Sequence, residues 1–329
     1  MEPDLTRPGV PASMELLPVL TDPHGRRIRK LRVSLTDVCN FRCTYCMPLG
    51  VRFAPSATLL PPDVLVGMVA GLVAEGIAEV RMTGGEPLAR REFRAIAAGI
   101  AALPLRRLGL TTNGFGLDAH LGFLAEIGCT SLNVSLDSLR PETFAAITRT
   151  PFFDRVLRSV LRAREMGFAV KVNAVVIRGA NDAEVEDFVD FSARYGIPVR
   201  FLEYMKIGPE RAEHAARFVP ASETMARIAE YHTLTPVSAE ADATAFSFRS
   251  EHGAEVGFIA SESRPFCATC SRLRLSSRGM LRACLMSEAG LSLVGVPRHG
   301  YTDVLAAVLP MKPTGRLPEI AQPMYEIGG

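Results

Sequence analysis

The 329-residue sequence is 48% hydrophobic and 22% charged, the balance of a globular protein with a filled core, and its net charge of +2 gives no argument for nucleic acid or an anionic membrane as partner. The first 20 residues lack the basic start and apolar stretch of a secretory signal. The longest apolar run, residues 64–74, is far shorter than the ~20 residues that span a bilayer. We therefore expect a cytoplasmic protein with no membrane and no nucleic-acid partner.

From residue 30 to about 205, a β-like run, a loop and an amphipathic or Ala-rich helix recur. The β-like runs are residues 31–37, 79–85, 107–114, 131–138, 168–177 and 197–205. The helical stretches between them are 62–78, 91–103, 118–128, 153–167 and 182–196. Six strands that alternate with helices predict an α/β fold with a parallel sheet, and we expect an incomplete (β/α)6 TIM-type barrel.

The pattern changes after residue 206. A connector with a short helix fills 208–232, and residues 234–240, 244–250 and 255–261 read as short antiparallel strands. We therefore divide the chain into a loose N-terminal leader (1–20), the partial barrel (21–206) and a C-terminal α+β extension (207–329) that closes the barrel.

Several predicted strands carry polar residues at alternating positions, where a plain barrel would have Val or Leu. Parallel strands are normally covered on both faces, so these positions predict a polar lumen for a large anionic ligand, with a solvent-facing side as the alternative. On the last strand, Arg200 and Met205 differ in parity, so a bulge or the strand's end must intervene if both point inward. The polar faces are Arg32, Ser34 and Thr36; Arg81 and Thr83; Thr111 and Asn113; Asn133 and Ser135; Lys171 and Asn173.

Seven cysteines, an odd number without a secretory signal, argue against a disulfide framework. Cys129 fits a small buried hydrophobe. Cys39, Cys43 and Cys46 follow the first strand with spacing C-x₃-C-x₂-C. Structural zinc requires four protein ligands, and no fourth Cys or His is nearby. Three thiolates on a four-iron cubane leave one iron free to bind a substrate or cofactor.

The second trio, Cys267, Cys270 and Cys284, leaves more than one centre open. Spacing alone does not separate an iron–sulfur cluster from zinc with His252 or His299 as fourth ligand. Beside Cys270, however, Arg272 and Arg274 share one face of an extended segment. Two adjacent guanidiniums suit a polyphosphate-like anion, with surface arginines as the plain alternative.

The first trio, with Tyr45 before its last cysteine and "GGEP" at the end of the second strand, resembles the radical S-adenosylmethionine superfamily. The resemblance implies that the trio holds a 4Fe–4S cluster and that adenosylmethionine chelates the open iron. Reductive cleavage of adenosylmethionine then gives methionine and a 5'-deoxyadenosyl radical. The residues implied around this cofactor are Tyr45, Gly84, Gly85, Glu86, Ser135 and Met205.

A longer set of motifs, including "NVSLDSL", "FCATCSRLRLSSRGMLRACL" and the terminal "IGG", resembles the GTP 3',8-cyclase family of molybdenum cofactor biosynthesis over residues 30–329. The resemblance implies a second 4Fe–4S cluster, held by the second trio, whose open iron binds guanine. Arg272 and Arg274 would contribute to catalysis, together with the tail Gly328 and Gly329 reaching into the site. The implied GTP-binding residues are Arg32, Arg81, Thr111, Lys171, Arg272, Leu273 and Arg274.

In the implied reaction, the radical abstracts the 3' hydrogen of GTP, and C3' then bonds to C8 of guanine. The implied partners are GTP, an electron donor of flavodoxin or ferredoxin type, the downstream cyclic pyranopterin monophosphate synthase and a second copy in a homodimer. Glu79 departs from relatives that are basic at this position. The alternatives are a radical enzyme that modifies peptides, with an auxiliary cluster, and an electron carrier or cluster scaffold.

Overall fold

The computed structural model describes residues 18–327, apart from the side chains of residues 209 and 210. Six parallel strands follow one another in chain order at the positions that the sequence predicts. Each ends one to three residues earlier than predicted, because the last predicted residues belong to the following loop. The strands are β1 (Lys30–Ser34), β2 (Glu79–Thr83), β3 (Arg107–Thr112), β4 (Ser131–Ser135), β5 (Ala169–Val176) and β6 (Val199–Glu203).

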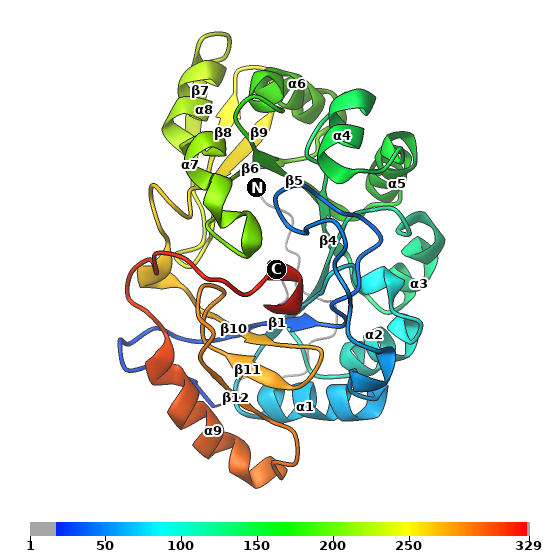
Figure 1. The fold of residues 1–329 in the computed structure, drawn as a ribbon, viewed down its shortest axis with the longest axis vertical. Helices are drawn as coiled ribbons and strands as arrows, with labels where there is room; N and C mark the ends of the chain where they lie inside the picture. The colour runs from blue at the N-terminus through cyan, green and yellow to red at the C-terminus, as the bar shows by residue number, and fades with distance from the viewer. Residues whose placement is uncertain (1–17, 328–329) are drawn as a thin grey trace.

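Helices cover the outer face of this curved sheet (Figure 1). The predicted helices are all present, and a further one, α4, follows the β4 loop with Pro at its first position. Apolar residues from the helices and strands form one continuous core beneath them. The helices are α1 (Pro62–Ala74), α2 (Phe93–Ala101), α3 (Leu121–Glu126), α4 (Pro141–Thr148), α5 (Phe153–Glu165) and α6 (Val185–Tyr195).

The C-terminal region adds strands to both edges of the sheet. β7 (Leu234–Val237), β8 (Phe246–Ser250) and β9 (Glu255–Ile259) pair antiparallel as predicted, and β9 also pairs parallel with β6. At the other edge, β10 (Arg272–Leu275) pairs parallel with β1, and β11 (Met280–Arg282) and β12 (Gly290–Ser292) continue outward.

The expected closure of the barrel is wrong. The order β12-β11-β10-β1-β2-β3-β4-β5-β6-β9-β8-β7 leaves the sheet open, with β12 and β7 at its edges. The physical reason is that β1 and β6, which would have to pair to close a six-stranded ring, bond instead to β10 and β9. The C-terminal region therefore extends the sheet instead of closing it.

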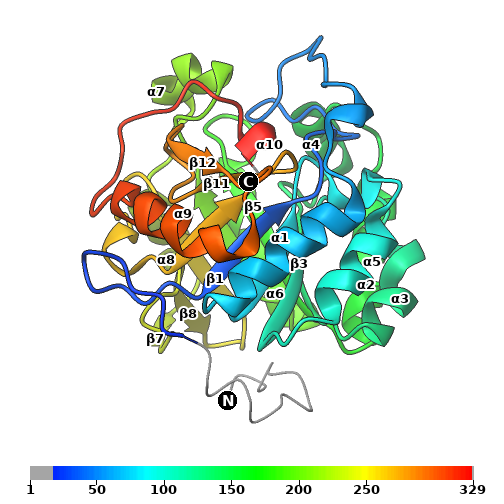
Figure 2. The ribbon, with the colours of Figure 1, turned by 90° about the horizontal axis from the view of Figure 1, so that it is seen from below.

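Four further helices accompany the C-terminal region: α7 (His214–Arg217), α8 (Ala221–Ala229), α9 (Tyr301–Val308) and α10 (Met324–Ile327). Helix α9 lies beside α1 (Figure 2). A Cβ on Gly71 of α1 would approach the Tyr301 ring to 2.4 Å, so only glycine permits this contact. From α9 the chain returns toward the second cysteine trio.

Among the described residues, Ser56–Ala74 is the one helical segment with the length and hydropathy of a membrane span. It consists of a short 3-10 turn (Ser56–Thr58) and α1, and it contains two prolines. Leu65, Val69 and Leu72 of α1 are fully buried in the core against the sheet. The segment is therefore a core helix in this fold.

Candidate functional site

The first cysteine trio follows β1, at the carboxyl ends of the central strands, whereas Cys270 of the second trio precedes β10 and is level with the amino end of β1. A large cavity extends between the two regions. It encloses about 1610 Å³ of space free of protein atoms, including its open mouth. Its walls carry Tyr45, beside the first trio, and all three cysteines of the second trio. Of the residues predicted to contact cofactor or substrate, it is lined by Arg32, Tyr45, Thr111, Ser135, Met205, Arg272 and Arg274.

The first trio lies in the loop after β1, packed partly against the core. Cys46 and Met47 both donate backbone hydrogen bonds to the carbonyl of Cys43 (3.0 Å each), so the loop forms a tight turn. Burial raises the pKa of Cys39 to about 11 and that of Cys46 to about 12. Without a cation the thiols stay protonated, so this pocket requires a positive centre to become a set of thiolate ligands.

Tyr45 is fixed by a buried carboxylate that the sequence analysis did not single out. Its hydroxyl donates to Asp137 Oδ2 at 2.8 Å, while Asp137 Oδ1 accepts from the backbone N–H of Val175 at 2.9 Å. Burial raises the pKa of Asp137 to about 6, against the lowering effect of both hydrogen bonds. This pairing holds the Tyr45 ring against the cavity.

The "GGEP" loop after β2 packs directly on the first cysteine loop. A Cβ on Gly84 would come within 2.6 Å of the Thr36 carbonyl, and one on Gly85 within 2.5 Å of the Val38 carbonyl. Two backbone hydrogen bonds, Gly85 N–H to Thr36 (2.7 Å) and Glu86 N–H to Val38 (2.8 Å), join the loops. The two glycines thus permit a contact within the protein that no larger residue allows.

Glu86 acts as an internal acceptor. Its carboxylate accepts from the Thr112 hydroxyl (2.7 Å) and from the backbone N–H groups of Asn113 (2.7 Å) and Leu88 (3.0 Å). Burial raises its pKa to about 7 despite these bonds. Glu86 therefore joins the β2 loop to the β3 loop, and its side chain lines neither of the two cavities.

The second trio has a strongly cationic environment. Cys270 Sγ accepts hydrogen bonds from Lys312 Nζ at 3.3 Å and from Arg272 Nη2 at 3.5 Å. Burial would raise the pKa of the Cys270 thiol, but the charges of Arg272 and Lys312 outweigh it and lower the pKa to about 6. Cys270 is therefore poised to ligate as a thiolate.

The two histidines considered as zinc ligands lie away from the second trio. His252 is exposed in the β8–β9 turn, where its ring packs on His232, and His299 is exposed before α9. Neither lines the cavity that contains the trio. Among the described residues, no group of three or more His, Cys, Asp or Glu side chains is arranged to hold a single metal ion.

Buried guanidiniums crowd the lumen. Burial lowers the pKa of Arg32, and nearby Arg274, Arg272 and Arg81 lower it further. Burial and Arg272 lower the pKa of Arg274 to about 10, and burial and Arg200 do the same for Arg81. Buried like charges disfavour one another unless an anion offsets them, so the lumen is built to receive a negatively charged ligand.

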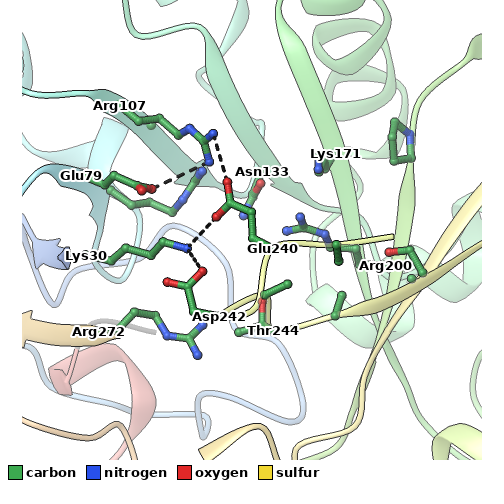
Figure 3. A pocket seen from close by; sticks show the side chains of 18 of the residues that line it. Lys30, Glu79, Arg107, Asn133, Lys171, Arg200, Glu240, Asp242, Thr244 and Arg272 are labelled. Carbon is green, nitrogen blue, oxygen red and sulfur yellow. Dashed lines mark hydrogen bonds and ion pairs between the residues drawn. The ribbon is translucent and has the colours of Figure 1, made fainter. Parts of the chain in front are cut away.

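A second cavity adjoins the first at the amino ends of the strands, and Figure 3 shows it. The two cavities share Arg32, Asn133, Arg200, Thr244 and Arg272 in their walls. Arg81 and Lys171, the remaining cations predicted to bind substrate, line the second cavity. The predicted polar lumen is confirmed for these residues, and we call the two adjoining cavities together the chamber.

The β7–β8 loop covers the outer end of the second cavity with carboxylates. Asp242 pairs with Lys30 at 2.8 Å, and Glu240 pairs with Lys30 at 3.3 Å and with Arg107 at 3.7 Å (Figure 3). Glu79 also pairs with Arg107, at 3.8 Å. The outermost cations are thus matched by carboxylates of the chain itself, whereas the inner arginines face other cations.

Some residues lie elsewhere than predicted. Leu273 is fully buried in the hydrophobic core and lines neither cavity, because alternation along β10 turns it away from Arg272 and Arg274. The Leu273 side chain thus lies outside both cavities, and the part of this residue in substrate binding stays a prediction. Met205 and Arg200 both reach the cavity, because Met205 follows the end of β6.

Ser34, Thr36, Thr83 and Asn113 line neither cavity. Thr36 and Asn113 instead accept hydrogen bonds from backbone N–H groups two residues further on, within their own loops. Gly328 and Gly329 lie outside the described residues. The helix before them, α10, reaches the middle of the molecule (Figure 1), and its Met324 lines the cavity.

Sequence reasoning missed several functional candidates. Gly109 leaves room for Arg81, whose guanidinium would lie 2.8 Å from a Cβ there. Lys312, whose ammonium bonds to Cys270, is one of only four lysines in the chain. That rarity was the one feature of the sequence that could have drawn attention to it. Asp137 stands in the quoted motif "SLDS" but was not assigned a role.

The chamber has features that indicate bound ligands. Buried polar atoms without a hydrogen-bond partner line it: Thr111 Oγ1, Asn173 Oδ1, Ser261 Oγ and Glu262 Oε1. Unsatisfied buried polar groups are costly, so they point to a bound polar molecule. Three thiols at each site are the donor set that iron–sulfur clusters take, one short of the usual four.

Comparison with known proteins agrees with this geometry. Residues 33–192 match the radical SAM superfamily, and residues 197–313 match the family described as Molybdenum Cofactor Synthesis C. A GTP 3',8-cyclase of Synechocystis is 43% identical over 97% of this chain and 98% of its own length. A GTP 3',8-cyclase of Aquifex aeolicus is 38% identical over 84% and 87%.

A solved structure shares the fold at low sequence identity. The crystal structure of Streptococcus suis SuiB bound to S-adenosylmethionine is similar with a TM-score of 0.64 and 13% identity, over 89% of this chain and 68% of that one. This likeness extends to the fold alone. From the near full-length identity to the curated relatives, the chain belongs to the GTP 3',8-cyclase family within the radical S-adenosylmethionine superfamily.

Proposed function

We propose that this protein is a GTP 3',8-cyclase that joins C3' to C8 of GTP in the first step of molybdenum cofactor biosynthesis. The observation that carries the proposal is the chamber, whose walls contain the second cysteine trio, a group of buried arginines and Tyr45 from the loop of the first trio. The relatives named GTP 3',8-cyclase support it over nearly the whole chain.

The first trio would hold one 4Fe–4S cluster, and the second trio would hold another beside the guanine. When bound, the first cluster and adenosylmethionine supply the one-electron chemistry that starts the reaction. Tyr45 and Ser135 face the cofactor from the chamber wall, together with Met205, which follows the end of β6. Gly84, Gly85 and Glu86 hold the first cysteine loop in place through their contacts with it and with the β3 loop.

The chain's cations would orient GTP. Arg272 and Arg274 lie next to the second trio, where they contact the base end of the substrate. Arg32 lies between the two cavities, and Arg81 and Lys171 reach the triphosphate from the second cavity. Guanidiniums on neighbouring strands bind phosphates by charge-assisted hydrogen bonds, and the enclosed chamber excludes water from the reacting carbon.

The remaining contributions follow from the same assignment. Thr111, with its unpartnered hydroxyl, binds substrate from β3. We assign Gly328 and Gly329 a role in catalysis from the family resemblance, because residues without side chains leave room for GTP. An electron donor of flavodoxin or ferredoxin type reduces the cluster, and a cyclic pyranopterin monophosphate synthase consumes the product. We place the protein in the cytoplasm, as a homodimer.

One assay tests this proposal. Anaerobically reconstituted protein is mixed with adenosylmethionine, a strong reductant and GTP deuterated at C3'. We expect GTP-dependent cleavage of adenosylmethionine, with deuterium transferred to 5'-deoxyadenosine. Cleavage that is indifferent to GTP would indicate another substrate, such as a peptide. Absence of cleavage in protein with both clusters loaded would indicate an electron carrier.

A further inference from the structure

Lys312 is buried at the back of the second cysteine trio, with its side chain only 2% exposed. Its ammonium donates to Cys270 Sγ at 3.3 Å, to the carbonyl of Arg272 at 2.6 Å and to the carbonyl of Ala283 at 3.0 Å. A lysine ammonium has three N–H donors, so each one has a partner. One charge therefore contacts a ligand thiol, the strand after it and the residue before Cys284.

The backbone at Lys312 is held as firmly as its side chain. Arg26, from the N-terminal turn, donates to the carbonyls of Lys312 (3.1 Å), Pro313 (2.7 Å) and Cys267 (2.7 Å). Arg26 is in turn paired with the fully buried carboxylate of Asp22 at 2.6 Å. This arrangement ties the cysteine loop and the lysine to the same guanidinium, so the Lys312–Cys270 contact is preorganised.

The sulfurs of the two trios receive different hydrogen bonds. In the first trio, Cys39 Sγ accepts from neutral groups, the backbone N–H of Phe41 at 3.4 Å and Asn113 Nδ2 at 3.9 Å. Beside the second trio, Cys270 contacts Arg272 and Lys312. Hydrogen bonds to the sulfurs and the net local charge are the factors by which a protein sets the reduction potential of an iron–sulfur cluster.

We propose that Lys312 is a positioning residue for the second cluster. It orients the Cys270 sulfur and raises the reduction potential of the second cluster above that of the first cluster. A positive charge and an N–H···S bond stabilise the reduced, more negative state of a cluster. At the first trio, the hydrogen bonds to Cys39 come from a backbone N–H and a side-chain amide, which carry no charge. The inference rests on the proposed function in one respect, the assignment of a 4Fe–4S cluster to the second trio.

The test isolates the second cluster in the full-length chain. Cys39, Cys43 and Cys46 are replaced by Ala, so that every cluster signal comes from the second trio. In this parent protein, Lys312→Met removes the charge, Lys312→Gln keeps an N–H donor for the buried carbonyls, and Lys312→Arg keeps the charge. Arg178→Gln, which removes an exposed charge paired with Glu223, is the matched control.

Iron per chain and the midpoint potential, measured by anaerobic redox titration with electron paramagnetic resonance, are the readouts. We expect about four irons per chain in the parent. The Met and Gln variants should shift the potential downward and lose part of their iron, while the Arg variant and the control keep the parent's values. If the Met variant does not fold, the Gln variant decides.

The outcomes separate this inference from the proposed function. Full iron content with the parent's potential in the Gln variant overturns the role of Lys312 and leaves the second cluster in place. A parent protein that binds zinc, or no iron, overturns the second cluster itself. Equal loss in the Gln and Arg variants assigns Lys312 a packing role only and also overturns the inference.

Discussion

Cys284 belongs to the second cysteine trio although it is distant from the other two cysteines in the sequence. It stands 14 positions after Cys270, and strands β10 and β11 form a hairpin between them that brings the chain back to the same cavity. Its side chain packs in a small apolar cluster with Met286 and Ile327, close to the C-terminal helix. The third ligand of the second trio is therefore positioned by packing as well as by the hairpin.

Replacing Cys284 with Ala should remove the second cluster and abolish cyclisation, while the first cluster remains. Iron should fall from about eight to about four per chain, measured on anaerobically reconstituted protein. Cys129→Ala is the matched control, since this buried thiol lines neither cavity. Retained cyclisation in the Cys284 variant would remove the role assigned to the second trio.

Gly85 allows a different test at the residue scale. Its Cβ would meet backbone carbonyls, of Val38 at 2.5 Å and of Asp37 at 2.6 Å, which cannot turn aside as a flexible side chain can. We expect Gly85→Ala to reduce the free energy of unfolding by about 1–3 kcal/mol and to lower iron loading at the first trio.

Gly122→Ala is the control for Gly85→Ala, because nothing lies within 4 Å of a Cβ in that exposed position of α3. Alanine is favoured over glycine inside a helix, so this variant should gain about 0.5–1 kcal/mol. Urea unfolding of the apoprotein measures both changes. Equal stability of the two variants would show that the GGEP loop can move away from the cysteine loop at no cost.

At the scale of elements, the β7–β8 loop is a structural cover for the outer end of the second cavity. It brings Glu240 and Asp242 onto Arg29 and Lys30, residues more than two hundred positions earlier in the chain. Burial opposes the charge on Asp242, but bonds from Lys30 and Ser271 lower its pKa to about 2. The loop is thus anchored by charge rather than by an apolar face.

The lowered pKa of Asp242 predicts the pH dependence of this anchor. A carboxyl with a folded-state pKa of about 2, against 3.8 unfolded, stabilises the fold above pH ~4, and this contribution is lost as the pH falls toward 2. Asp242→Asn should lower the free energy of unfolding at pH 7 by on the order of 1 kcal/mol, after allowance for solvent screening.

The difference between wild type and Asp242→Asn should shrink between pH 4 and 2, as measured by urea unfolding at each pH. Asp190→Asn, at an exposed position of α6, serves as the control and should follow the wild type throughout. A difference that is constant over this pH range would mean that Asp242 stabilises the loop by shape and not by charge.

At the scale of the whole molecule, the open sheet and the C-terminal region together build a chamber with cysteines at one end and cations throughout. Arg32, Arg200 and Arg272 belong to both cavities, although they come from β1, β6 and β10. Arg32 is repelled by Arg272 and by the neighbouring Arg274 and Arg81, and a bound anion would offset this repulsion. Ligand binding should therefore be visible as global stabilisation.

We expect GTP to raise the melting temperature of the anaerobic holoenzyme by about 2 °C or more at concentrations well above its dissociation constant, and guanosine to raise it much less. The reason is that only the nucleotide triphosphate places negative charge among the buried arginines. Lys171→Gln should reduce the GTP shift and leave the guanosine shift unchanged. Equal shifts with GTP and guanosine would show that the cations do not bind the triphosphate.

Local patterns in the sequence determined the order of the central strands and the residues of the candidate site. The spacing of the cysteines, the alternation of polar residues along the strands and the recurrence of strand and helix each extend over a few residues, and metal ligation and side-chain periodicity act over that range. They were sufficient to predict both trios, the inner cations Arg32 and Lys171 and the order of the six central strands.

The tertiary structure alone decided the remainder. The open sheet, the contact of Lys312 with Cys270 across 42 positions and that of Arg26 with Cys267 across 241 depend on how separate elements pack. No periodicity encodes which distant carbonyl or thiol a buried cation will meet. Such partners are selected by the cost of leaving a buried charge unpaired, and that cost arises only once the chain is folded.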